Sequence, residues 1–308
     1  MGWKKLGLVF DVRKQNIGWL KSHAMVPTPI LIDDRIRVYF SGRDFQGRSR
    51  VGFVDVASSN PQKILYTHDK PILELGKLGT FDDSGTIPTC VVSDGPLLYL
   101  YYTAYNIRAT VPYGNSIGLA SSKDNGLSFE HVFEGPVVER NQTEPYIAVS
   151  PCVVINKDIW HLWYGSGTGW VIVNGKPESL YHIKYAHSID GKYWVRDNVS
   201  CILPNDPMEA IARPWVIQHG DDYEMWYCYR GSADFRDGKD SYRIGYATGQ
   251  EPVSWKRRDY DVGITEGPEE YDNKMQAYPA VLDVGGVRYL FYNGNGFGYN
   301  GFCCAIWE

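Results

Sequence analysis

Residues 151–164 read PCVVINKDIWHLWY, and this outline organises the whole 308-residue chain. A proline opens a short apolar stretch, a polar turn follows, and a second apolar stretch ends in an aromatic pair. The outline occurs five times, at prolines 61, 63, 63 and 65 residues apart. The prolines and their pairs are Pro27 with Tyr39-Phe40, Pro88 with Tyr101-Tyr102, Pro151 with Trp163-Tyr164, Pro214 with Trp226-Tyr227, and Pro279 with Phe291-Tyr292. A repeat of this length that fills a chain indicates a repeat architecture.

Each repeat predicts four antiparallel strands. The first strand follows the proline, over 28–32, 89–92, 152–155, 215–218 and 280–284. Turns rich in Asp, Gly and Asn lead into the second strand, which carries the aromatic pair. A third strand (VGFV, IGLA, IKYA, IGYA, FCCA) and a polar outer strand complete the repeat. We therefore predict an all-β fold, a single five-bladed β-propeller domain over 1–308. A β-sandwich has no reason to repeat every 63 residues, and a β-helix coil is much shorter.

The two ends of the chain predict how the ring closes. The fifth repeat stops at Glu308 after its third strand, so it lacks an outer strand. Residues 3–10, WKKLGLVF, resemble the outer strands of other repeats. We expect this N-terminal strand to complete the last blade, which removes an exposed sheet edge.

Composition excludes several classes of partner. The net charge is −5 and the chain has no run of Lys or Arg, which argues against nucleic acid. No apolar stretch approaches membrane-spanning length, and the start lacks a signal-peptide pattern, so we predict a cytoplasmic protein without a membrane partner. The six cysteines form no CxxC pair, which favours reduced core thiols, and no ligand spacing calls for a metal or other cofactor.

The working face is predicted from the loops. Loops between the second and third strands vary in length, and they lie at the same end as the segments that lead into the first strands. The predicted catalytic residues all lie in these leads: Asp83, Glu144, Glu209 and His23. The predicted substrate-binding residues are Arg43, Asp44, Tyr105, Trp170, Arg213, Arg230, Gln276, Tyr278 and Asn293.

A structural interpretation of these residues stands beside the catalytic one. Asp83 and Glu209 share the offset of five residues before their prolines, which a repeated structural cap would also produce. Glu144 precedes Pro145 and fits an exposed turn as well. Several arginines on one face indicate an anionic group on the ligand.

With its five repeats and acids in the leads, the chain resembles the arabinanase, levansucrase and invertase-like superfamily of five-bladed propeller glycosidases, including β-mannoside phosphorylases. That resemblance implies a base or nucleophile from the first blade, a transition-state-stabilising or pKa-tuning Asp from the second and a general-acid Glu from the third. By position, Asp83 matches the second role and Glu144 the third, whereas Glu209 has no counterpart. The first lead departs, because His23 stands where the acid is expected. Some members hold a cation on the axis.

These observations lead to a predicted function with alternatives. We expect a carbohydrate-active enzyme, glycoside hydrolase-like, that acts on a glycosidic bond in a central funnel and takes a carbohydrate or sugar phosphate. A phosphorylase or transferase that needs an acid and an anion clamp is one alternative. A catalytically silent sugar-binding propeller is the other.

Overall fold

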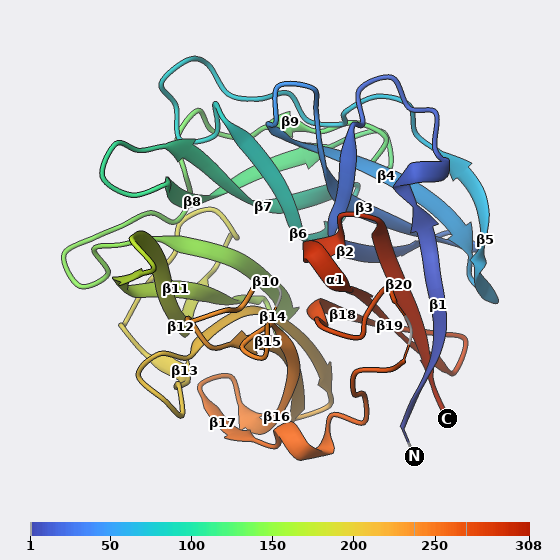
Figure 1. The fold of residues 1–308 in the computed structure, drawn as a ribbon. Coiled ribbons are helices and arrows are strands. Elements are labelled where there is room, and N and C mark those ends of the chain that lie inside the picture. The colour runs from blue at the N-terminus through green and yellow to red at the C-terminus, as the bar shows by residue number, and fades with distance from the viewer. Residues whose placement is uncertain (1, 237, 269) are drawn as a thin grey trace.

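The computed structural model describes residues 2–236, 238–268 and 270–308, and nearly all of its regular structure is β strand (Figure 1). The all-β prediction is confirmed. Short helical turns are confined to η1 (Val12–Lys14), η2 (Asp259–Asp261) and α1 (Asn295–Gly298) within the described part.

The strands of the described residues form units of four. Units 1 to 4 follow chain order from inner to outer strand, whereas unit 5 takes its outer strand from the N-terminal segment. Three units are separate sheets, and a single parallel contact between Ser49 and Gly85 joins the first two units into one larger sheet. Unit 1 contains β2 (Ser22–Ile32), β3 (Arg35–Arg43), β4 (Ser49–Ala57) and β5 (Asn60–Thr67). Unit 2 contains β6 (Gly85–Asp94), β7 (Leu97–Ile107), β8 (Tyr113–Ser122) and β9 (Glu130–His131). Unit 3 contains β10 (Ala148–Asn156), β11 (Ile159–Val173), β12 (Lys176–Ser188) and β13 (Ser200–Ile202). Unit 4 contains β14 (Ala210–His219), β15 (Asp222–Arg230), β16 (Arg243–Glu251) and β17 (Ser254–Arg257). Unit 5 contains β18 (Ala277–Val284), β19 (Val287–Asn293), β20 (Gly301–Trp307) and β1 (Trp3–Asp11).

The units surround a common centre (Figure 1). Each first strand contacts the first strand of the next unit, in the order β2, β6, β10, β14, β18, and β18 contacts β2. The inner strands therefore form a closed ring. Hydrophobic clusters fill the spaces between neighbouring units, including the space between units 5 and 1.

The N-terminal strand completes the C-terminal unit, as predicted. β1 pairs antiparallel with β20, from Trp3 opposite Trp307 to Asp11 opposite Gly301. Its Phe10 is fully buried and packs on Phe40 and Phe302 at ring distances of 5.0 and 5.7 Å. This strand therefore protects the edge of unit 5 and fills the junction with unit 1.

The repeat prolines lie inside the inner strands, and the prediction that they open these strands is wrong. Each inner strand starts before its proline, and its pairing register shifts at that point. The residue before the proline has positive φ in four units: Val26, Ser150, Arg213 and Tyr278. A β-bulge accepts proline because the bulged residue gives up a ladder hydrogen bond. In unit 2 the shift comes one residue later, after Pro88, which explains why its aromatic pair is also one residue late.

The six cysteines are free and buried. Their assignment as core thiols is therefore confirmed. No helix among residues 2–236, 238–268 and 270–308 has the length and apolar character to cross a membrane.

Replacing Phe10 with alanine tests the closure of the ring. We expect Phe10→Ala to lower the free energy of unfolding by about 3–5 kcal/mol, because it leaves a cavity between fully buried rings. Urea unfolding followed by fluorescence measures this change. Lys4→Ala on the same strand is the control: its ion pair with Glu308 is exposed, so we expect a change within about 1 kcal/mol. Equal effects of the two variants would contradict the role assigned to Phe10.

Candidate functional site

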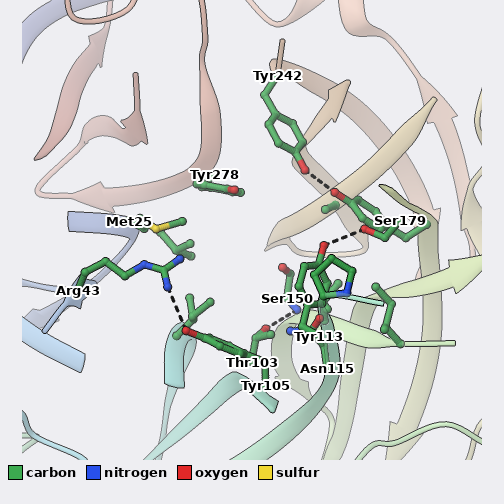
Figure 2. A pocket seen from close by; sticks show the side chains of 17 residues that line it. Met25, Arg43, Thr103, Tyr105, Tyr113, Asn115, Ser150, Ser179, Tyr242 and Tyr278 are labelled. Carbon is green, nitrogen blue, oxygen red and sulfur yellow. Dashed lines mark hydrogen bonds between the residues drawn. The ribbon is translucent and has the colours of Figure 1, made fainter. Parts of the chain in front are cut away.

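A pocket of about 330 Å³ lies at the centre of the ring (Figure 2). All five units contribute to its wall. The residues that line it are Met25, Val26, Arg43, Ile87, Thr103, Tyr105, Pro112, Tyr113, Asn115, Ile147, Val149, Ser150, Ser179, Tyr181, Ala212, Tyr242 and Tyr278. Its volume is at the lower end of the range for small-molecule pockets, about 300–1,000 Å³.

The bulges of the inner strands place residues at this pocket. Val26, Ser150 and Tyr278, all with φ between 51° and 56°, line the wall. Side chains of neighbouring units hold these strained positions. The Val26 amide donates to Asn293 Oδ1 at 2.7 Å, and the Ser150 amide donates to Thr103 Oγ1 at 2.7 Å. Strained backbone that its surroundings hold in place is typical of binding sites.

Tyrosine rings form much of the wall. The five are Tyr105, Tyr113, Tyr181, Tyr242 and Tyr278. Tyr181 and Tyr242 share a hydrogen bond between their hydroxyl groups, and Tyr113 bonds to Ser179 Oγ at 3.1 Å (Figure 2). Burial raises the pKa of Tyr113, Tyr242 and Tyr278, so these hydroxyls stay protonated at neutral pH. Such a wall offers apolar ring faces together with fixed hydroxyl groups.

One cationic side chain, Arg43 at the end of β3, lines the pocket. Its guanidinium donates to Tyr105 Oη at 3.0 Å and to the Gly47 carbonyl at 3.1 Å. His23 lies close by, with Nδ1 2.8 Å from Ser22 Oγ and its ring edge-on to Tyr299. Burial, and then the charge of Arg43, lowers the pKa of His23 to about 4, so its imidazole is neutral at neutral pH.

The other two predicted arginines are buried around the pocket. Arg213 is completely buried on the axis, where it donates to the carbonyls of Thr89 and Pro27 and to Thr28 Oγ1. Arg230 is 3% exposed and donates to Tyr242 Oη at 3.3 Å and to the Ser179 carbonyl at 2.8 Å.

Four further predicted binding residues do not line the pocket. Asp44 is buried in a turn where it accepts from Arg48, and Trp170 packs on Tyr113 at 5.3 Å. Gln276 donates to Asp272 and to the Thr265 carbonyl. Asn293 donates to the carbonyls of Ala24 and Gly301 and supports Val26. Among the predicted binding residues, the pocket thus contains Arg43, Tyr105 and Tyr278.

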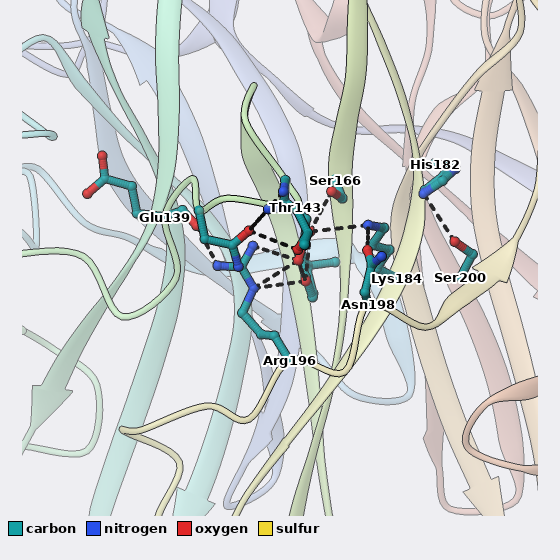
Figure 3. Close-up of polar contacts among 11 residues, drawn as sticks. Glu139, Thr143, Ser166, His182, Lys184, Arg196, Asn198 and Ser200 are labelled. Atoms are coloured by element: carbon teal, nitrogen blue, oxygen red, sulfur yellow. Dashed lines mark hydrogen bonds and ion pairs between the residues drawn. The ribbon is translucent and has the colours of Figure 1, made fainter.

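The predicted acid Glu144 is buried in an ionic network. Figure 3 labels its partners Ser166, Lys184 and Arg196. Tyr164 donates its hydroxyl to the carboxylate at 3.0 Å, and Ser166 donates as well. Arg196 forms an ion pair with it at 2.7 Å, and Lys184 lies 3.9 Å away. Every oxygen of this carboxylate is therefore engaged within unit 3.

The same arrangement recurs in units 2, 4 and 5. In each, the second residue of the aromatic pair is a tyrosine that donates its hydroxyl to an acid, and a basic side chain on the outer strand contacts that acid. The sets are Asp82 with Tyr102 and His131, Asp259 with Tyr227 and Arg257, and Asp272 with Tyr292 and Lys5. We call this arrangement the tyrosine latch, because it ties the loop over a unit to its second and outer strands.

Unit 1 differs, and it explains the missing acid in the first lead. Its aromatic pair ends in Phe40, which has no hydroxyl group to donate. Trp19 stacks on Phe40 at 6.5 Å in place of an ion pair. In units 2, 3 and 5 the acid that accepts from the tyrosine lies in the lead, whereas in unit 4 it is Asp259, which follows the outer strand. Unit 1 has no tyrosine at this position and no acid in residues 18–27 of its lead.

The remaining predicted acids also lie outside the pocket. Asp83 accepts from the Gly79 amide at 2.9 Å and from Ser84. Glu209 forms a two-point ion pair with Arg257 at 2.9 and 3.0 Å, next to the latch of unit 4. The expected ring of Asp83, Glu144 and Glu209 around the central pocket is not observed, because none of them is among its lining residues. Their catalytic roles stay predictions.

Several pocket residues were missed in the sequence, although a signal existed. Asn115, Tyr181 and Tyr242 all stand two residues before the apolar motif of the third strand, at equivalent repeat positions. Val26 and Ser150 stand directly before repeat prolines. Among the described residues, no three His, Cys, Asp or Glu side chains are grouped so that they could hold a metal ion.

Comparison with known proteins identifies relatives over the whole chain. The uncharacterized protein Rv1502 of Mycobacterium tuberculosis is 37% identical over 310 residues and is covered completely, as is this chain. The chain belongs to the family of this mycobacterial protein. No protein-family model matches it.

Solved structures share its fold at low sequence identity. One glycoside hydrolase has a TM-score of 0.73 at 14% identity, covering 99% of this protein and 91% of that one. A thermostable family-43 glycoside hydrolase has a TM-score of 0.69 at 17% identity, with 92% and 88% covered. An exo-1,5-α-L-arabinanase from a bovine ruminal metagenomic library has a TM-score of 0.64 at 14% identity, with 95% of both proteins covered. The protein thus has the fold of the propeller glycosidases that its sequence resembles.

Tyr164→Phe tests the tyrosine latch. We expect it to lower the free energy of unfolding by about 1–3 kcal/mol, because a buried carboxylate loses a hydrogen-bond donor. Urea unfolding measures the change. Tyr193→Phe is the matched control, since Tyr193 is 72% exposed, and should be neutral. If both variants unfold alike, the latch contributes nothing to stability.

The His23 environment predicts a pH dependence. Between pH 6.5 and about 4, His23 is protonated in the unfolded state but stays neutral in the folded state. The free energy of unfolding therefore falls as the pH is lowered through this range. His23→Gln should make that fall less steep, while NMR of the wild type should show a neutral imidazole at pH 6. An imidazole that titrates between pH 6 and 7 would contradict the burial of this ring.

Proposed function

We propose that this protein binds a carbohydrate in its central pocket. The observation that carries the proposal is the wall of five tyrosines at the centre of a fold shared with glycoside hydrolases. Aromatic rings pack against the C–H faces of sugar rings, while fixed hydroxyl and amide groups select orientation. Here Thr103, Asn115 and Ser150 supply such groups beside the rings.

We further propose that the five units are the blades of a five-bladed propeller and that residues 1–308 form one domain. The closed sequence of inner-strand contacts and the pairing of β1 with β20 support this. The pocket sits where the inner strands meet, and Arg213 occupies the axis beside Ala212 of its wall. A ligand would then enter from one face. The cytoplasmic location remains a prediction of the sequence.

The distribution of acids favours binding over ordinary glycoside hydrolysis. Hydrolysis usually needs two carboxyl groups that flank the glycosidic bond, about 5–9.5 Å apart. None of the 17 residues that line the pocket is Asp or Glu. Glu144 and Glu209 are engaged by arginines instead. We therefore propose a sugar-binding protein of glycoside hydrolase-like fold that does not use the two-carboxylate mechanism in this pocket.

Sugar binding is tested by removing one ring. We expect Tyr113→Ala to weaken binding of any glycan or sugar phosphate that binds the wild type by at least about tenfold, which corresponds to about 1.4 kcal/mol. A glycan array finds the ligand and isothermal titration measures its affinity. Tyr193→Ala, on an exposed ring, is the control and should bind like the wild type.

A turnover assay on the same ligands separates binding from catalysis. Wild-type protein should release no product from a bound glycoside. Release of a sugar that Glu144→Gln, Asp83→Asn or Glu209→Gln abolishes, while the variant stays folded, would overturn the silent-binding proposal and support the predicted enzyme. The absence of any bound sugar on the array would refute the function altogether.

A further inference from the structure

The pocket is surrounded by arginines that lack acidic partners. Arg43 lines it, Arg230 lies behind its tyrosine wall and Arg213 lies on the axis beside it. Within the described part of the chain, none of the three forms an ion pair with a carboxylate. Three positive charges therefore gather at the centre of the ring without a matching negative charge.

Buried cations away from the pocket have acidic partners. Arg37 pairs with Asp55 at 2.7 Å, and Lys184 lies 3.9 Å from Glu144. Arg196 and Arg257, which are mostly buried, also pair with carboxylates. Among the described residues, the buried and half-buried arginines without an acidic partner are therefore those at the pocket, in a protein whose net charge is −5.

Arg230 and Arg213 are deeply buried among neutral groups, so no carboxylate offsets the positive charge of either arginine. Arg230 donates to the carbonyls of Gly231 and Ser179 at 2.8 Å, and its guanidinium lies 3.8 Å from the centroid of the Phe235 ring and 5.4 Å from that of Tyr181. Arg213 binds carbonyls and lies 4.9 Å from the centroid of the Trp215 ring. Burial lowers the pKa of Arg213 to about 10, so it remains cationic at neutral pH.

Arg43 is the arginine that a ligand can reach. Its hydrogen bonds to Tyr105 and Gly47 both come from the same terminal nitrogen, Nη1. Its Nε and Nη2 groups have no hydrogen-bond acceptor among the described residues, and they can donate to a ligand. Guanidinium groups bind carboxylates and phosphates through paired hydrogen bonds. A positive field in a site of low dielectric constant strengthens such a contact.

We propose that the central pocket binds an anionic carbohydrate, with its carboxylate or phosphate at Arg43 and with Arg213 and Arg230 supplying a positive field. This inference rests on the proposed sugar-binding function and adds the charge of the ligand. An anionic ligand also explains why no Asp or Glu lines the pocket, because a carboxylate in the wall would repel the ligand.

Matched sugar pairs test the charge of the ligand by isothermal titration. The probes are D-glucuronate against D-glucose, D-galacturonate against D-galactose, and α-D-glucose 1-phosphate against D-glucose. We expect the anionic member of at least one pair to bind at least about tenfold more tightly at about 20 mM salt, and the advantage to shrink at about 0.5 M salt. The uronates and the sugar phosphate are tested separately. The class of probe that binds more tightly identifies the anionic group as a carboxylate or a phosphate.

Two arginine variants locate the effect. Arg43→Gln should remove the advantage of the anionic probe, while the affinity for its neutral partner changes by less than about threefold. Arg50→Gln is the matched control, because Arg50 lies on the adjacent strand β4 and pairs with Glu74, which is 82% exposed in its side chain. It removes the same charge and should keep the advantage. Circular dichroism confirms that each variant is folded.

The outcomes separate this inference from the proposed function. If neutral sugars bind and their anionic counterparts bind no more tightly, the proposal of an anionic ligand is wrong, whereas the proposal of sugar binding is retained. If Arg50→Gln removes the advantage as fully as Arg43→Gln, net charge explains the effect and the site at Arg43 is wrong. If no probe binds and no glycan on the array binds, both proposals fail.

Discussion

The hydrogen bonds of the buried Arg213 guanidinium hold the centre of the molecule together. This guanidinium projects from a bulge in β14 and donates to carbonyl groups of β2 and β6, so it joins three of the inner strands at one point. Hydrogen bonds from a charged group contribute about 1.5–3 kcal/mol each, and more is lost when a buried partner is left without one. The left-handed backbone at Arg213, with φ of 58°, is what aims this side chain at the axis. The strain at the bulge and the packing at the centre therefore stabilise one another.

The tyrosine latches organise the periphery as Arg213 organises the centre. A hydroxyl on the second strand, an acid in a connecting segment and a basic side chain on or near the outer strand are joined in four of the units in the described chain. The latch acids Asp82, Glu144 and Asp272 are buried, whereas the side chain of Asp259 is 22% exposed. Removing the basic partner of a buried acid leaves that acid without compensation. Unit 1 replaces the whole set with the stack of Trp19 on Phe40. Unit 1 thus has Phe40 at the position of the latch tyrosine and no latch acid among its described residues.

Much of the fold was predictable from the sequence, whereas the site was predictable only in part. The repeat predicted the strands and their grouping, and the incomplete fifth repeat predicted the pairing of β1 with β20. A bulge shifts which residue faces the centre by one position, and no pattern of apolar residues shows it. A latch joins residues such as Glu144 and Arg196, which are 52 positions apart, so the acid looks unpaired in the sequence. Arg43, Tyr105 and Tyr278 were found because they stand at strand ends or beside a repeat proline, where every repeat approaches the pocket.

The balance of charge ties these features to function. In the latches of units 3, 4 and 5 the carboxylate pairs with an Arg or Lys, and in unit 2 Asp82 contacts His131. None of these acids lines the pocket. Among the buried and half-buried arginines of the described residues, the three at the centre have no carboxylate partner. An isolated buried charge is costly, and a protein tolerates it where a partner arrives from outside. In this protein guanidinium groups lie around a cavity of tyrosines whose lining contains no Asp or Glu. This is why we propose that the cavity holds a negatively charged sugar and does not transfer protons to it.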